Sequence, residues 1–184
     1  ELGIGGRGLS PNRTSNFNTR QNGYDISADA LGYPESYYTP PTESLQRIES
    51  TFKTNNFTVP RTKVVVNLAP ADIKKSGTAF DLAIALGILG ASEQLENREA
   101  LSQYVIMGEL ALDGEIRSIK GALPIAIQAR KEGFKGLIVP KMNAKEAGMV
   151  NNLNVYGVSH IKEVIDFFEN EEKGLEPTVV NTRD

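Results

Sequence analysis

The chain of 184 residues contains no cysteine and a single histidine, His160. The missing cysteines exclude disulfide bonds, zinc–thiolate sites and cysteine nucleophiles. A lone histidine excludes a metal site built from several histidines, and a Ser-His-Asp triad would have to use His160. We predict that His160 is an ordinary surface residue. The side chains that remain as candidates for catalysis are those of serine, threonine, lysine and the carboxylates.

Long apolar runs and a strong net charge are absent as well. The longest apolar stretch, residues 79–91, contains Asp81 and is too short to span a bilayer. No signal-peptide pattern opens the chain, so we expect a cytoplasmic protein with no membrane partner. The net charge of −3 and the pI near 5.4 argue against a surface that binds nucleic acid strongly, although they are compatible with a local basic patch.

Composition divides the chain into three parts. Residues 1–42 are rich in Gly, Asn, Ser, Thr and Pro without a sustained period, which predicts a flexible and divergent N-terminal segment. Residues 43–170 alternate between helical and strand-like patterns. They predict one α/β (α+β) domain, in which a mixed sheet packs with helices. The acidic residues 171–184 indicate a solvated linker that leaves the domain.

Hydrophobic periodicity locates the elements of this domain. Leu45, Ile48 and Phe52 recur at helical spacing. The helix that begins near Thr78 is apolar on nearly every side, so we expect it at the centre of the core, with Thr78 and Asp81 as its capping signal. The remaining predictions are strands over 64–68, 103–112, 115–119, 137–140 and 154–158, a two-residue turn at Asp113-Gly114, a helix over 123–131 ending at Gly133, a helical turn after 142, and a final helix capped by Ser159.

Three segments in this order resemble one known architecture. They are VNLAPADIKKSGTAFDLAIALGILGAS, MGELALDGEIRSIKGALPIAIQARKEGFKGLIVPKMNAKEA and YGVSHIKEVIDFF. They are similar to the N-terminal domain of the ComM/YifB proteins, which are bacterial ATPases of the Mg-chelatase-like AAA+ group. The resemblance covers residues 46–184 and implies a Lon protease-like fold, also called ribosomal protein S5 domain 2-like. The N-terminal quarter departs from the family's pattern.

The resemblance implies a role for a longer protein. Such a protein would be a hexameric ATPase with DNA branch-migration activity in natural transformation, a ring-shaped homo-oligomer with DNA among its partners. The chain contains no G-x-x-x-x-G-K-[ST] motif, so ATP and Mg²⁺ would belong to an AAA+ module beyond residue 184. We therefore expect no cofactor, no metal and no catalytic residue in this chain, and no enzymatic activity of its own.

The same resemblance implies the loss of a protease dyad. In Lon-type proteases, a serine at the start of the central helix is activated by a lysine, because serine is a poor nucleophile at neutral pH. Matching the segments places Ala79 at the serine position and Leu123 at the lysine position. Neither side chain can attack a carbonyl or accept a proton.

An active Ser/Thr–Lys peptidase with a shifted dyad is the alternative. Thr78 or Ser76 would then be the nucleophile, with Lys120 or Lys75 as its base. A shift of one residue at a helix start turns a side chain by about 100°. This rotation favours the simpler interpretation, in which Thr78 caps the helix and the lysines are solvated charges.

Charged side chains supply the remaining candidate contacts. Lys74, Lys75 and Asp81 are candidates for a subunit interface, although a carboxylate in the first helical turn is explained as well by the helix dipole. The hairpin carboxylates at 109, 113 and 115 are typical of a solvated face rather than a cation site. The candidate DNA contacts, which we expect to share one region, are Lys131, Lys135, Lys141 and Lys145.

Overall fold

The computed structural model describes residues 18–20, 23–27, 37–38, 42–60, 63–67 and 78–180. It confirms an α/β fold, in which a parallel sheet packs against helices, while the finer likeness to the Lon protease domain stays a prediction. In chain order the elements are β1 (Asn18–Arg20), β2 (Gly23–Ser27), β3 (Tyr37–Tyr38), α1 (Thr42–Thr54), β4 (Lys63–Asn67), α2 (Asp81–Ala91), the 3₁₀ helix η1 (Arg98–Gln103), β5 (Tyr104–Ile106), β6 (Glu109–Leu110), β7 (Ile116–Arg117), α3 (Ala122–Lys131), β8 (Gly136–Pro140), α4 (Lys141–Ala147), β9 (Asn154–Val158) and α5 (Ile161–Glu169).

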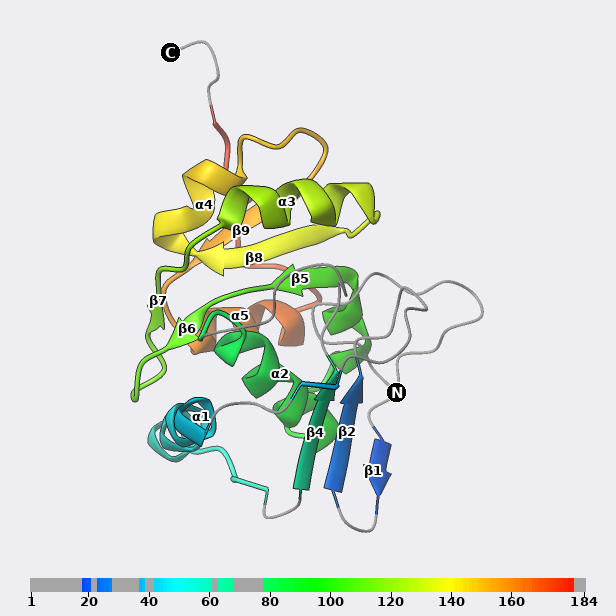
Figure 1. The fold of residues 1–184 in the computed structure, drawn as a ribbon, viewed down its shortest axis with the longest axis vertical. Helices are drawn as coiled ribbons and strands as arrows, with labels where there is room; N and C mark the ends of the chain where they lie inside the picture. The colour runs from blue at the N-terminus through cyan, green and yellow to red at the C-terminus, as the bar shows by residue number, and fades with distance from the viewer. Residues whose placement is uncertain are drawn as a thin grey trace.

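A three-stranded parallel sheet in the order β5-β8-β9 organises the C-terminal half of the fold. The helices α3 and α4 lie on one face of this sheet, while α2 and α5 lie on the other (Figure 1). Burial on both faces explains why β8 consists of consecutive apolar residues, all buried. No helix within the described ranges is long and apolar enough to cross a membrane.

A second sheet, in the order β1-β2-β4-β3, extends into the N-terminal segment that we predicted to be flexible. There β1 and β2 form an antiparallel hairpin, and β2 runs parallel to β4 with Gly23 opposite Lys63. The sheet therefore crosses the predicted domain boundary at residue 43, which itself stays a prediction. The alternation of Tyr24 and Ile26 with polar residues was the only local signal for β2.

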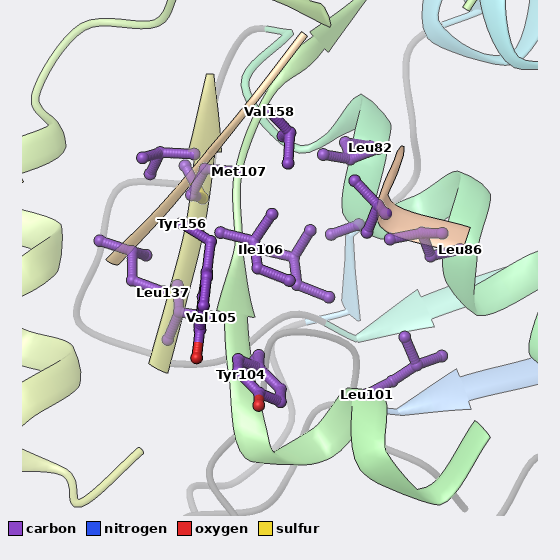
Figure 2. Packing of buried hydrophobic residues seen from close by; sticks show 14 of the residues in the cluster. Leu82, Leu86, Leu101, Tyr104, Val105, Ile106, Met107, Leu137, Tyr156 and Val158 are labelled. Atoms are coloured by element: carbon purple, nitrogen blue, oxygen red, sulfur yellow. The ribbon is translucent and has the colours of Figure 1, made fainter. Parts of the chain in front are cut away.

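The helix α2 lies at the centre of the core, as predicted. All of its residues are buried, and it packs against α1, η1, β2 and β6. Figure 2 shows Leu82 and Leu86 of this helix facing Ile106 of β5 and Val158 of β9. A helix that is apolar on every side is stable only when protein surrounds it.

The predicted apolar face of α1 is only partly correct. Ile48 and Phe52 are buried, whereas Leu45 is 38% exposed. The buried face instead continues through Ser44 and Thr51, and the Thr51 hydroxyl donates a hydrogen bond to the carbonyl oxygen of Ala111 at 3.0 Å. The helix α1 thus packs against the hairpin partly through polar side chains, which the hydrophobic pattern does not show.

The predicted hairpin exists, but its strands and its turn differ from the prediction. The predicted strand 103–112 is divided, because β5 belongs to the parallel sheet and β6 pairs with β7. The turn has three residues rather than two. The N–H of Gly114 donates to the Ala111 carbonyl, the N–H of Ala111 donates to the Glu115 carbonyl, and Gly114 has a φ of +99°. This is a type I turn followed by a left-handed glycine.

Gly133 ends α3 as predicted. Its φ is +78°, and the N–H of Phe134 donates to the Ala129 carbonyl at 3.1 Å, which completes a Schellman motif. Three residues later, Gly136 begins β8 with an ordinary strand conformation but little space. An ideal Cβ there would lie 2.8 Å from Tyr104 Cε1 and 2.9 Å from the Asn154 carbonyl oxygen.

These two glycines should respond differently to substitution. We expect Gly136→Ala to lower the free energy of unfolding by about 1–3 kcal/mol through overpacking. Gly133→Ala should cost about 1–2 kcal/mol through its left-handed backbone, since its Cβ would meet open space. Asparagine tolerates the left-handed region, so Gly133→Asn should recover most of the loss, while Gly136→Asn should be worse than alanine. Urea unfolding measures all four variants, and rescue by asparagine at both positions would contradict this assignment.

An aromatic cluster lies between the parallel sheet and α5. Tyr104 is almost fully buried and packs edge-on against Phe167 and Phe168, with ring centroids 5.8 Å and 5.5 Å away. Tyr156 completes the cluster, 6.2 Å from Tyr104. Burial, and then a hydrogen bond to Glu172, hold the pKa of Tyr104 far above its ordinary value of 10.0.

The raised pKa of Tyr104 should make stability depend on alkaline pH. A tyrosine in the unfolded chain ionises near pH 10, while Tyr104 in the fold keeps its proton, so the unfolded state loses a proton first. The free energy of unfolding should therefore fall as the pH rises above about 10. Tyr104→Phe should reduce this fall, and Tyr156, whose pKa burial also raises, should account for part of the remainder. Urea titrations at about pH 9 and about pH 11 measure the effect; an equally steep fall in Tyr104→Phe would show that this phenol is not responsible.

Candidate functional site

A buried charge pair holds the first turn of α2. Asp81 is 1% exposed, and its Oδ2 accepts hydrogen bonds from Arg47 Nε at 2.8 Å and from the N–H of Leu110 at 3.1 Å. Arg47 Nη2 donates to Asp81 Oδ1 at 3.2 Å and to Ser44 Oγ at 3.0 Å. A single carboxylate therefore joins α1, α2 and β6.

The capping role predicted for Thr78 and Asp81 is wrong. Asp81 does lie in the first turn of α2, but the N-cap residue is Phe80 and no side chain caps the helix. The Thr78 hydroxyl donates to a carboxylate oxygen of Glu109 instead. The backbone of the hairpin region serves the helix end, since the N–H of Leu82 donates to the Gly108 carbonyl at 3.0 Å.

The electrostatics of this site favour the charged form of Arg47. The hydrogen bond that Arg47 donates to Asp81 raises the pKa of Arg47, burial opposes this increase, and Glu109 adds to it. A carboxylate buried this deeply is tolerated only when it is paired and its other lone pairs are satisfied. Arg47 and the Leu110 N–H together supply those partners.

The two dyad positions lie in different surroundings. The Ala79 carbonyl accepts a hydrogen bond from the N–H of Gly108 at 2.8 Å, at the entry to α2. Leu123 lies in the first turn of α3, where its N–H donates to Glu146 Oε1 at 3.3 Å on the side of α4. Both apolar side chains pack against the core.

The shifted dyad gains no geometric support from the residues that the structure describes. Thr78 is engaged with Glu109, and no described hydrogen bond or ion pair joins Thr78 to Lys120, which is exposed. Ser76 and Lys75 lie outside the described residues, as does Lys74.

The lysines predicted to share one basic region are divided. Lys135 and Lys141 flank opposite ends of β8, which separates their Cα atoms by about 20 Å at the usual rise of a strand. Lys135 Nζ is 2.8 Å from Glu172 Oε1 and so is already paired. Lys131, at the end of α3, is exposed. The predicted DNA contacts therefore do not form one compact cluster, and their role in DNA binding stays a prediction.

His160 has a structural role that the sequence did not show. Its Nδ1 accepts a hydrogen bond from the N–H of Lys162 at 3.1 Å, so His160 rather than the predicted Ser159 caps α5. Its Nε2 lies 3.2 Å from the carbonyl oxygen of Asp113 at the hairpin tip. These two contacts tie α5 to the hairpin.

An open hollow of about 510 Å³ lies at the carboxyl ends of β8 and β9. The N–H of Ile116 donates to the Ser159 carbonyl at 2.9 Å, which holds the hairpin along one side of the hollow. The strands predicted over 137–140 and 154–158 both end at this edge, where parallel strands often leave a crevice. The lining residues are Glu115, Ile116, Lys141, Met142, Val158 and Ser159. No group of three His, Cys, Asp or Glu side chains in the described ranges could hold a metal ion.

Comparison with known proteins places these features in a family. The family described as subunit ChlI of Mg-chelatase matches residues 38–143, more than half of the chain. The chain belongs to this ChlI family. The matched region contains both Arg47 and Asp81, while the β1–β2 hairpin precedes it.

The relatives of this ChlI-family chain include two that are named for a role. Competence protein ComM of Haemophilus influenzae is 40% identical over 143 residues, which are 78% of this chain and 27% of ComM. Protein YifB of Escherichia coli is 39% identical over 139 residues, 76% of this chain and 26% of YifB. DNA repair protein RadA of Aquifex aeolicus is 35% identical over 104 residues, 56% of this chain and 22% of RadA. The chain spans about a quarter of the length of these relatives.

The family corrects one of our expectations. From the missing dyad and the missing phosphate-loop motif, we expected no enzymatic activity in this chain itself, although we expected the longer protein to be an ATPase. The family to which the chain belongs is that of a chelatase subunit, and a chelatase is an enzyme. Membership of an enzyme family overturns the expectation, because the absence of two motifs from 184 residues describes only those motifs.

The charge pair of the ChlI-family chain should dominate its response to mutation. Replacing either Asp81 or Arg47 by alanine leaves its partner without a counter-charge, so we expect each to lower the free energy of unfolding by about 3–5 kcal/mol. The double variant should lose much less than the sum. Glu49 and Lys53, an exposed pair on the same helix, form the control and should couple by less than about 0.5 kcal/mol. Additive losses at Arg47 and Asp81 in the double-mutant cycle would show that the pair does not act as a unit.

Proposed function

We propose that the chain is an assembly module of a Mg-chelatase-related AAA+ ATPase that acts on DNA in branch migration, recombination and natural transformation. One observation carries this proposal: related segments occur in relatives named as a competence protein and as a DNA repair protein, and each is about a quarter of its protein. A segment shared in this way has the character of a module. We further assign it a Lon protease-like fold.

Assembly is favoured over direct DNA contact by the charges of the chain. Its net charge is −3, Lys135 is neutralised by Glu172, and the other candidate lysines are divided between the two ends of β8. Phosphate contacts need several cations on one surface. The partner we propose is therefore a second copy of the protein in a homo-oligomeric ring, while ATP and Mg²⁺ bind to residues that the longer relatives carry elsewhere.

Deleting this module from the full-length ATPase tests the proposal. We expect the deletion to abolish nucleotide-dependent oligomers in light scattering and to lower the rate of branch migration on a four-way DNA junction. Replacement of both Lys131 and Lys141 by alanine is the control, and it should leave junction affinity unchanged within about twofold, because in this proposal the module makes no phosphate contacts through them.

Each other outcome identifies a different function. Intact oligomers after the deletion would contradict the role in assembly. A large loss of affinity in the lysine variant would show that the module binds DNA directly. Turnover of fluorogenic peptides that disappears in Thr78→Ala would establish the shifted-dyad peptidase instead.

A further inference from the structure

Residues 171–180, which belong to the predicted solvated linker, are largely exposed but contact the domain at two places. Glu172 is only 19% exposed, and the N–H of Thr178 donates to the Val155 carbonyl at 2.7 Å. Figure 1 shows this red segment passing close to α4 before the chain ends. The contacts come from two sites, one near the start of the segment and one near its end.

The first site is a carboxylate that receives two donors from the parallel sheet. The hydroxyl of Tyr104 donates to Glu172 Oε1 at 2.6 Å, and Lys135 Nζ donates to the same oxygen at 2.8 Å. Tyr104 begins β5 and is held by the aromatic cluster, while Lys135 immediately precedes β8. The position of the donors is therefore determined by the core.

The backbone around Glu172 adopts a conformation that side chains disfavour. Glu171 and Glu172 have φ values of +57° and +62°, so two consecutive residues other than glycine are left-handed. Such residues persist where the surroundings over-determine them. Glu171 is 87% exposed, and its only described ion pair is a long one of 3.8 Å to the exposed Lys173. The N–H of Lys173 donates to the Asn170 carbonyl at 3.2 Å and closes a turn around these two residues, and the contacts of the Glu172 side chain add to its stability.

The second site covers an edge of the parallel sheet. β9 is an edge strand, paired with β8 alone among the described strands. The bond between Thr178 and Val155 engages one of its free carbonyls, and side-chain carbons of Thr178 and Val180 lie beside Gly148. An unpaired strand edge is a site where another chain can add, so covering it protects the domain.

We propose that residues 171–180 form a latch, with Glu172 as its catch, that sets the direction in which the chain leaves this domain. Leu175 packs partly buried against the core, whereas Val179 is 92% exposed, so the charged contacts of Glu172 are a principal attachment of the segment. One consequence rests on the proposed function: in the full-length ATPase, the latch fixes the orientation of the module relative to the rest of the protein. Release of the catch uncovers the edge of β9.

Amide hydrogen exchange of the 184-residue chain tests the latch. Glu172→Ala and Tyr104→Phe should each increase the exchange rate of the Thr178 amide roughly tenfold or more, since each removes a hydrogen bond to a charged group. Glu171→Ala is the matched control, because it changes a neighbouring residue with the same backbone conformation but an exposed side chain, and it should change the rate by less than about twofold. The amide of Ile138 in β8 reports whether the core stays folded.

Spin labels provide a second measurement. Because the chain contains no cysteine, labels attach only at cysteines that are introduced by substitution. Labels at Lys162→Cys and Val179→Cys, both exposed, should give a narrow distance distribution that broadens when Glu172→Ala is added. Unchanged exchange and an unchanged distribution in Glu172→Ala would overturn the latch, as would an equal effect of Glu171→Ala. Neither measurement involves ATP or DNA, so failure of the latch is distinguishable from failure of the proposed function.

Discussion

The fold depends on how a carboxylate is accommodated inside its most apolar helix. Asp81 is the only charged residue of α2, and every residue of that helix is buried. A buried carboxylate without a counter-charge would destabilise the fold by several kcal/mol. The guanidinium of Arg47, 34 positions earlier, supplies the counter-charge, and the N–H of Leu110 supplies a further hydrogen bond. In doing so they fix α1 and the hairpin against the core.

Local sequence signals predicted most of the helices and the parallel strands, because those elements are specified by their own residues. α2 is apolar throughout, and Gly133 both permits and marks the end of α3. The partners of Asp81 were not predictable in this way. A capping interaction satisfied the same local pattern, and only the packing of α1 brings Arg47 within 2.8 Å. The structure also divides the strand predicted around Gly108, whose backbone pairs with the start of α2.

The hairpin of β1 and β2 was not predicted from the sequence for a similar reason. Its residues are polar and rich in glycine and asparagine, and strand propensity depends strongly on neighbours. The strand β2 is specified by its partner β4, which lies 40 positions later in the register from Gly23 to Lys63. A composition typical of flexible chain was therefore compatible with a strand once a parallel partner was available.

A missing motif does not determine the function of a protein, just as a local sequence signal does not by itself determine its structure. The absence of a dyad at Ala79 and Leu123 describes two positions, whereas membership of the ChlI family concerns the whole protein of which such a segment is a part. The charged residues that the structure brings together act in joining elements. Asp81 joins two helices to a hairpin, and Glu172 joins the departing chain to two strands. Each of these carboxylates holds elements that are distant in the sequence at fixed positions relative to one another.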